Sequence, residues 1–197
     1  MDTGLIRKDF PILETKVNGH RVVYFDNAAT TQRPRPVVEA VTNYILHQNG
    51  NPHRGAHVFA ISASEAYDGS KTAVKDFIGA KSEKEIIYTR NTSESLNLVA
   101  RSYGETRLKP GDRILIPITE HHSNLVPWQR VAKKTGAVLD YIYIDKKTGH
   151  FLEEDLKKID NPAVKILAFA QVSNVMGIKF DAKALIQRAH KHGAVVV

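Results

Sequence analysis

Apolar positions in the second half of the chain follow two alternating patterns. Short runs of Val, Ile and Leu, typical of strands buried on both faces, alternate with segments whose apolar positions repeat every three or four residues, as in amphipathic helices. The predicted strands are Arg113–Ile118, Val138–Ile144, Val164–Ala170 and Ala194–Val197. The predicted helices between them are Leu125–Thr135, Leu152–Ile159 and Ala182–His192. This alternation indicates βαβ units, and therefore an α/β fold with a mostly parallel sheet flanked by helices.

The first half carries the same patterns with more turn residues between them. Residues 1–20 are expected to form a short helical segment that ends in a turn at Asn18-Gly19-His20. The elements expected after it are a strand at Arg21–Phe25, a helix opened by Pro34 and Pro36, a helix from Ser62 to Ile78 stopped by Gly79, a strand at Glu85–Thr89, and a helix carrying Leu96 and Tyr103. The residues expected to face inward from the helix before Gly79 are Ala66, Ala73, Val74 and Phe77. We expect residues 21–197 to form one domain.

Composition places the chain among globular proteins. Of its 197 residues, 42% are hydrophobic and 25% are charged. No run reaches the roughly 18 consecutive apolar residues of a membrane span, and the first residues lack a signal-peptide core, so we expect a cytoplasmic protein. The net charge of +7 comes from Lys and Arg scattered over the predicted helices, which favours solvated faces over a nucleic-acid site.

The absence of cysteine limits the chemistry of these residues. With zero Cys, residues 1–197 hold neither a disulfide nor a thiolate metal site, and a cysteine nucleophile would lie elsewhere. The chain also ends inside the valine strand Ala194–Val197. Because a folded domain rarely stops within its central sheet, we expect a fragment of a larger enzyme.

Polar residues follow four predicted strands. These groups are Asp26–Thr31, Arg90–Ser95, Glu120–Asn124 and Gln171–Asn174. The carboxyl ends of parallel strands meet at one edge of a sheet, where open α/β proteins bind ligands. The sequence therefore predicts one ligand site along this edge.

Two adjacent imidazoles belong to the third of these groups. Ser123 or Asn124 is a candidate helix N-cap, which would place His121 and His122 between a strand end and a helix N-terminus. A neutral imidazole there can stack on a flat heterocycle or transfer a proton. The alternative is that one histidine caps a turn and the other is solvated.

Other candidate residues also have more than one interpretation. The hydroxyls of Thr92 and Ser93 at a helix start can bind a phosphate, or form a capping box with an acidic residue downstream. The Asn174 carboxamide can bind a ligand carboxylate or fasten the loop before Gly177. Arg54 can recognise a carboxylate, brace a subunit contact or lie in a solvated turn.

Two classes of cofactor are disfavoured by spacing. The residues His53, His57, His121 and His122 match no standard set of metal ligands, so no metal site is predicted. Neither Gly-x-Gly-x-x-Gly nor Gly-x-x-x-x-Gly-Lys-Ser/Thr occurs, which counts against a dinucleotide or nucleoside triphosphate cofactor.

Five blocks in order along the chain resemble the SufS/CsdA-type cysteine desulfurases, class V enzymes with pyridoxal 5′-phosphate (PLP) fold type I. The blocks are Tyr24–Gln32, Asn51–His57, Thr89–Ala100, Glu120–Gln129 and Val172–Gly177. The resemblance implies the amino-terminal part of the PLP-binding large domain, truncated before the lysine that holds the cofactor. It also implies a homodimer.

The resemblance assigns roles to individual residues. It makes His121 the catalytic imidazole stacked on the cofactor ring, and places Thr92 and Ser93 at the cofactor phosphate. Asn174 would contact both cofactor and substrate near the carboxylate. The residues implied on the substrate side or at the subunit interface are Ala28, Ala29, His53 and Arg54. Asn91 and Ser95 stand where many relatives have glycine, and Ser93 replaces the usual second threonine.

The implied reaction converts L-cysteine to L-alanine and leaves persulfide sulfur on the enzyme for iron–sulfur cluster assembly, with a SufE- or SufU-like protein as a sulfur acceptor. The family's lysine and nucleophilic cysteine belong after residue 197, so residues 1–197 alone are expected to be inactive. Another class V activity, namely selenocysteine lyase, epimerase or aminotransferase, remains an alternative. Alternatives from other classes are a non-catalytic binding protein and a basic nucleic-acid binder.

Overall fold

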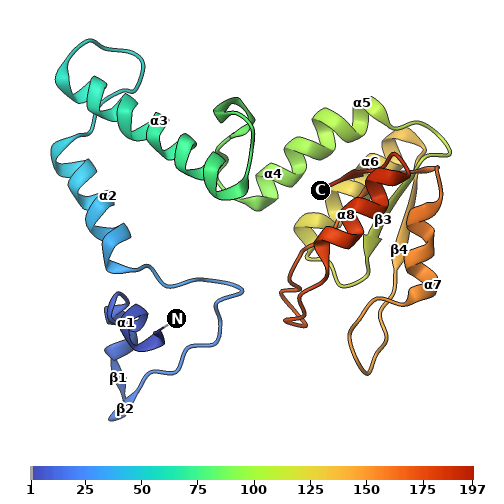
Figure 1. Ribbon diagram of the computed structural model, residues 1–197, viewed down its shortest axis with the longest axis horizontal. Helices are drawn as coiled ribbons and strands as arrows, with labels where there is room; N and C mark the ends of the chain where they lie inside the picture. The colour runs from blue at the N-terminus through green and yellow to red at the C-terminus, as the bar shows by residue number, and fades with distance from the viewer. Residues whose placement is uncertain (1) are drawn as a thin grey trace. The chain divides into compact units, whose positions relative to one another are not determined.

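The computed structural model describes residues 2–197, which form two compact units. One unit ends at Tyr88 and the other runs from Thr89 to Val197 (Figure 1). Within residues 2–197, none of the helices combines the length and the hydrophobicity that a membrane span requires.

The first unit begins with two short helical segments and a β-hairpin whose strands are two residues long. Helix α1 is Thr3–Lys8 and the 3-10 helix η1 is Pro11–Glu14. Strand β1, Lys16–Val17, pairs antiparallel with β2, His20–Arg21. Positive φ angles at Asn18 (52°) and Gly19 (80°) form the tight connection between them. The turn predicted at Asn18-Gly19-His20 is confirmed.

The strand predicted at Arg21–Phe25 is wrong beyond Arg21. Val22 still donates a backbone hydrogen bond to Thr15, but the chain then loses its partner strand. Val23 and Phe25 are exposed. A hydrophobic pattern alone does not produce a strand. A strand also needs a neighbouring backbone that forms hydrogen bonds with its N–H and C=O groups.

Two long helices follow. Helix α2, Arg35–His47, begins after Pro34 as predicted. Helix α3, Val58–Ile78, begins four residues before the predicted start, because the His57 ring accepts a hydrogen bond from the Ala60 N–H and caps it there. It ends at Gly79, whose φ of 71° suits glycine.

The inward face predicted for α3 is wrong in this unit. The buried residues are Ala60 and Ala63, whereas Ala66, Ala73 and Phe77 are exposed and Val74 is half-buried. The buried end lies where the backbone of Gly50 approaches Phe59 and Ala60 closely. The strand predicted at Glu85–Thr89 is also wrong, since Glu83–Glu85 form the 3-10 helix η2 and residues 86–89 pair with no strand.

The second unit contains the predicted parallel sheet. Its four strands are β3 (Arg113–Pro117), β4 (Val138–Ile142), β5 (Val164–Leu167) and β6 (Val195–Val196). Their order is β4-β3-β5-β6, and every neighbouring pair is parallel. All four predicted strands of this region are confirmed, each shorter than its apolar run.

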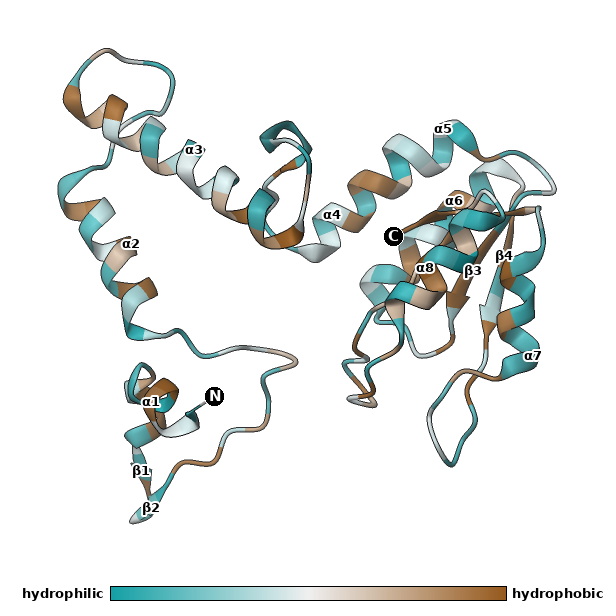
Figure 2. Cartoon of the chain, viewed as in Figure 1, coloured by the Kyte–Doolittle hydropathy of each residue, from teal (hydrophilic) through white to brown (hydrophobic). Residues whose placement is uncertain are grey.

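Helices cover both faces of this sheet. Alternate residues of β3 point to opposite sides, so Ile114 and Ile116 belong to one buried cluster and Leu115 to the other. The first cluster is covered by α4 (Thr92–Val99), its π-helical continuation η3 (Ala100–Gly104) and α6 (Val126–Thr135). The second is covered by η5 (Lys157–Asp160) and α8 (Ala182–Lys191). Figure 2 shows β3 as an apolar strand between helices with polar outer faces.

Two short helices complete this unit. Helix α5, Glu105–Arg107, continues η3 and leads into the loop before β3. Helix α7, Glu153–Leu156, precedes η5, and together they occupy the helix predicted at Leu152–Ile159. The helices predicted at Leu125–Thr135 and Ala182–His192 are confirmed as α6 and α8.

Candidate functional site

The strand order reverses between β3 and β5, and we refer to the carboxyl ends of these two strands, with the loops that follow them, as the crevice. From β3 the chain passes through α6 to β4 on one side, and later returns to place β5 on the other side of β3. Such a reversal in strand order is where open α/β sheets bind ligands. Two of the polar groups singled out in the sequence, Glu120–Asn124 and Gln171–Asn174, follow these two strands.

The loop after β3 presents His121 in a defined orientation. His121 caps the 3-10 helix η4, His122–Asn124, and its Nδ1 accepts a hydrogen bond of 3.1 Å from the Ser123 N–H. Since Nδ1 accepts, a neutral His121 ring carries its proton on Nε2. The imidazole is exposed, so its faces and Nε2 are open to a ligand.

The helix N-cap predicted at Ser123 or Asn124 is wrong. Both residues lie inside η4, and α6 begins at Val126 with Pro127 in its first turn. Proline there needs no side-chain cap because it lacks one of the free N–H groups of a helix start. Asn124 is instead buried and hydrogen-bonded to Glu120 and Trp128.

The loop after β5 leaves Asn174 exposed. Ser173 is buried, and its hydroxyl accepts from the N–H groups of Val175 and Met176, at 3.3 and 3.1 Å. The turn closes with the Gly177 N–H donating to the Ser173 carbonyl oxygen at 2.9 Å. Ser173 therefore fastens this loop. Asn174 makes no side-chain hydrogen bond to any other residue in the described part of the chain.

The start of α4 has the capping box expected from sequence, shifted by one residue. Asn91 is the N-cap, and its Oδ1 accepts from the Glu94 N–H at 2.9 Å. Glu94 in turn accepts from the Arg90 N–H at 2.7 Å, and this hydrogen bond is the main cause that lowers the Glu94 pKa. Thr92 and Ser93 thus occupy the first two helical positions, where backbone N–H groups have no intrahelical partner.

Helix α4 belongs to the same unit as His121. Helix α4 packs against η4 within the second unit. The second unit thus carries an exposed imidazole, a helix that starts with two hydroxyls, and a carboxamide without a side-chain hydrogen bond. An imidazole face suits a flat aromatic ring, a helix N-terminus suits a phosphate, and a carboxamide suits a carboxylate. The donor set therefore fits a phosphorylated heterocycle carrying an amino acid.

The remaining predicted residues lie in the first unit. Ala28 and Ala29 are exposed in a turn that the Tyr24 hydroxyl closes by donating to the Thr30 carbonyl oxygen at 2.7 Å. His53 has a positive φ of 59°, and its N–H donates to the Ser64 hydroxyl at 2.8 Å. Arg54 is exposed in the same loop. Each of these residues is thus held in a turn of its own unit.

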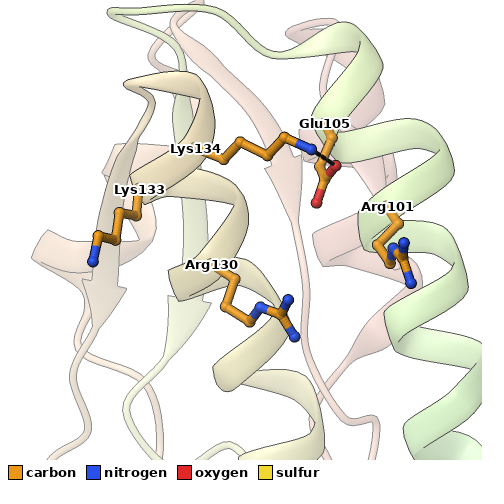
Figure 3. Close-up of a pocket in the computed structure, with 5 residues that line it drawn as sticks. All are labelled: Arg101, Glu105, Arg130, Lys133 and Lys134. Carbon is orange, nitrogen blue, oxygen red and sulfur yellow. Dashed lines mark hydrogen bonds and ion pairs between the residues drawn. The ribbon is translucent and has the colours of Figure 1, made fainter.

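Among the residues described, no group of three or more His, Asp or Glu side chains lies close enough to hold a metal ion. A basic cavity does occur elsewhere in the second unit, with a volume of about 630 Å³. Figure 3 shows its five lining residues, Arg101, Glu105, Arg130, Lys133 and Lys134. Lys134 pairs with Glu105 and lowers the Glu105 pKa, with smaller contributions from Arg101 and Arg130.

This cavity is separate from the crevice. Lys133 and Lys134 lie in the last turn of α6, shortly before β4 begins, whereas the crevice lies where β3 and β5 end. No sequence pattern indicated it, because its cations come from two helical segments far apart along the chain. The hydrogen bonds between Glu120, which is half-buried, and the buried Asn124 were also overlooked, although the spacing of four residues between them, and between Asn124 and Trp128, was visible.

Comparisons with known proteins agree with this architecture. The model of the family described as aminotransferase class-V matches residues 23–197. The chain is 46% identical over 192 residues to a probable cysteine desulfurase of Synechocystis, covering 98% of this chain and 46% of that protein. It is 44% identical over 197 residues to a probable cysteine desulfurase of Halalkalibacterium halodurans, covering 100% and 48%.

Solved structures give the same result. The apo cysteine desulfurase of Thermococcus onnurineus matches with a TM-score of 0.87 and 41% identity, over 98% of this chain and 46% of that one. The cysteine desulfurase CsdA of Escherichia coli matches with a TM-score of 0.81 and 36% identity, over 100% and 48%.

The chain therefore belongs to the class-V aminotransferase family. More particularly, its fold is PLP fold type I, as the resemblance implied, and its relatives include proteins named cysteine desulfurases. The chain spans about half the length of the curated relatives it matches. Enzymes of this family depend in general on PLP, which is a phosphorylated heterocycle of the kind that the site fits.

Proposed function

We propose that the whole protein is a PLP-dependent cysteine desulfurase, which converts L-cysteine to L-alanine and transfers the sulfur to a cysteine of the enzyme as a persulfide. The observation that carries the proposal is the exposed His121 at the β3–β5 crevice, in a chain 46% identical to a probable cysteine desulfurase over nearly its full length. Residues 1–197 contain no cysteine, so the sulfur-accepting thiol would lie outside them.

Different residues of the crevice would bind different parts of PLP and its substrate. The N–H groups and hydroxyls at Thr92 and Ser93 would bind the phosphate, assisted by the positive end of α4. The His121 imidazole would stack on the ring, with Nε2 available as a proton donor because Nδ1 accepts from Ser123. The Asn174 carboxamide would donate to the substrate carboxylate.

Bound PLP would supply an electron sink for the substrate's α-carbon. The protein's part is to orient the ring, exclude water and hold a proton at His121 Nε2. On the substrate side we propose Ala28, Ala29, His53 and Arg54, in agreement with their exposure within their own turns. We also propose a homodimer, a SufE- or SufU-like sulfur acceptor, and a role in iron–sulfur cluster assembly, all by analogy with the SufS/CsdA-type enzymes.

The test is alanine release from L-cysteine by the complete protein with PLP and a reductant. His121→Ala should lower kcat by about tenfold or more, because both ring stacking and the Nε2 proton are lost. His122→Ala is the matched control and should retain activity, since His122 is an exposed neighbour outside the proposed contacts. Absence of alanine from the wild-type protein would refute the desulfurase function, and faster turnover of selenocysteine would favour a selenocysteine lyase.

A further inference from the structure

Three side chains and one backbone group form a continuous hydrogen-bonded chain behind His121. The Trp128 Nε1–H donates to Asn124 Oδ1 at 2.9 Å, and Asn124 Nδ2 donates to Glu120 Oε2 at 2.8 Å. The other carboxylate oxygen, Glu120 Oε1, accepts from the Ala170 N–H at 2.8 Å. Trp128 is fully buried and Asn124 nearly so. These hydrogen bonds connect α6, the loop after β3 and the segment after β5, so they link the two sides of the crevice.

The donor and the acceptor of each of these hydrogen bonds are fixed by the chemical groups involved. The indole N–H can only donate, so it must face the Asn124 oxygen, and the Asn124 NH₂ must therefore face Glu120. The Ala170 N–H can also only donate. Glu120 is thus required to accept at both oxygens, which a carboxylate does and a carboxamide cannot.

Each carboxylate oxygen of Glu120 therefore accepts a hydrogen bond. These bonds hold in place the loop that carries His121. The loop is attached to the segment after β5 through Glu120 and to the core through Asn124. Asn124 also donates its backbone N–H to the His121 carbonyl oxygen at 2.8 Å. The backbone of His121 is therefore held from both neighbouring sides, while its ring remains exposed.

We propose that Glu120 and Asn124 are positioning residues for His121, acting through these hydrogen bonds as a relay. The relay requires that one of the two side chains donates to the other, while position 124 accepts from Trp128 and position 120 accepts from Ala170. The proposal rests on the proposed function, because the position of His121 matters only if its ring meets the cofactor. It predicts a specific rescue. Exchanging the two functional groups, as in Glu120→Gln combined with Asn124→Asp, restores each hydrogen bond and keeps the same net charge.

Each single variant breaks the relay. Glu120→Gln places an NH₂ group against the N–H of either Ala170 or Asn124, and Asn124→Asp places a second carboxylate against Glu120. In the double variant, the new carboxylate at position 124 would accept from Trp128 and from the new amide at position 120. The oxygen of that amide would accept from Ala170. The size and shape of the side chains barely change, so the variants differ mainly in hydrogen-bond polarity.

The experiment uses the complete protein with PLP. We expect each single variant to lower kcat for alanine release by about tenfold and to weaken the circular dichroism of the bound cofactor, because a small misplacement of a catalytic group is costly. The double variant should return to within about threefold of wild type. Glu154→Gln, at an exposed residue of α7 outside the relay, is the matched control and should change neither signal.

Thermal unfolding of the apoprotein gives a second readout that does not depend on catalysis. If both single variants unfold at lower temperature yet keep normal kcat, KM and cofactor dichroism, the relay is only structural and the positioning role is wrong. If the double variant is as impaired as the two single variants combined, the directional relay itself is wrong. A wild-type protein that neither binds PLP nor releases alanine would contradict the proposed function, whereas rescue of apoprotein stability would still support the relay.

Discussion

At the scale of single residues, the second unit satisfies its buried polar groups with directed partners. No buried side-chain nitrogen or oxygen among the described residues lacks a hydrogen bond. The Glu120–Asn124–Trp128 relay is one such arrangement, and the pair formed by Asp160 and Arg188 is another. Arg188 donates from Nε to Asp160 Oδ1 at 2.7 Å and from Nη2 to Oδ2 at 2.6 Å. This fork joins η5 to α8, both on the same face of the sheet.

Because Asp160 pairs with Arg188, we expect the free energy of unfolding to depend on pH. The hydrogen bonds from Arg188 are the main cause that lowers the Asp160 pKa from its ordinary value of 3.8. A lowered native pKa means that the stabilisation is fully present above pH 3.8 and is lost as the pH falls through the native pKa. Asp160→Asn should therefore reduce the free energy of unfolding at pH 7 by about 0.5–1 kcal/mol, a small value because the pair is partly exposed.

Urea denaturation of the complete protein between pH 7 and about pH 3 measures this effect. The difference between wild type and Asp160→Asn should shrink towards the acid end of the series. Glu154→Gln, which removes an exposed carboxylate with no hydrogen-bond partner in the described structure, should show little difference at any pH. An equal deficit of Asp160→Asn across the whole range would contradict the linkage.

At the scale of elements, the segment from α4 to α5 is a continuous helical stretch with a π-helical turn, η3, in its middle. Such π-helical turns are rare. This one packs closely against α6. A Cβ atom added to Gly104 would lie 3.2 Å from Val131 Cγ1 and 3.3 Å from Trp128 Cζ3, and both of these side chains are buried.

Gly104→Val should therefore destabilise the protein by about 1–3 kcal/mol, because the added isopropyl group would have to displace buried core atoms. Urea denaturation of the complete protein is the measurement. The matched control is Gly69→Val in α3, since a Cβ at Gly69 meets nothing within 4 Å and replacing a helical glycine normally helps. Equal destabilisation by both substitutions would show that contact with Trp128 and Val131 does not decide the outcome.

The sequence predicted strands correctly where an apolar segment is buried and pairs with neighbouring strands. The runs Arg113–Ile118 and Val164–Ala170 have neighbours on both sides in the sheet, so their apolar pattern was sufficient. Most of Arg21–Phe25 and all of Glu85–Thr89 have similar patterns but pair with no adjacent strand, and there the prediction was wrong. An apolar pattern is a property of one segment, whereas strand pairing depends on a second segment elsewhere in the chain.

The predicted parts of the site differ from the overlooked ones in the same way. His121, Thr92 and Asn174 stand at strand ends or helix starts, which are visible as sequence boundaries. The N-cap at Asn91 was missed because Thr92 and Ser93 beside it are equally good caps by type. The role of Asn124 was missed because only the fold brings Glu120 to the backbone of Ala170, 50 residues away in sequence.

At the scale of the whole molecule, ligand binding at the crevice should increase the stability of the complete protein against unfolding. A ligand that binds only the native state stabilises it by RT ln(1 + [L]/Kd), which is about 2.7 kcal/mol at roughly 100 times Kd. PLP should therefore raise the midpoint of thermal unfolding of the complete protein. Pyridoxal, which lacks the phosphate, should raise it less, because the N-terminus of α4 would then have no anion to bind.

Thr92→Val combined with Ser93→Ala removes the two hydroxyls at that helix start and should reduce the shift caused by PLP while leaving the smaller shift caused by pyridoxal unchanged. Ser102→Ala, which removes an exposed hydroxyl further along the same helical stretch, is the control and should respond to both ligands as the wild type does. If the double variant lost its response to both ligands alike, the hydroxyls would serve the fold and not the phosphate. If it kept the full response to PLP, the two hydroxyls would contribute nothing to phosphate binding, and their proposed role would be wrong.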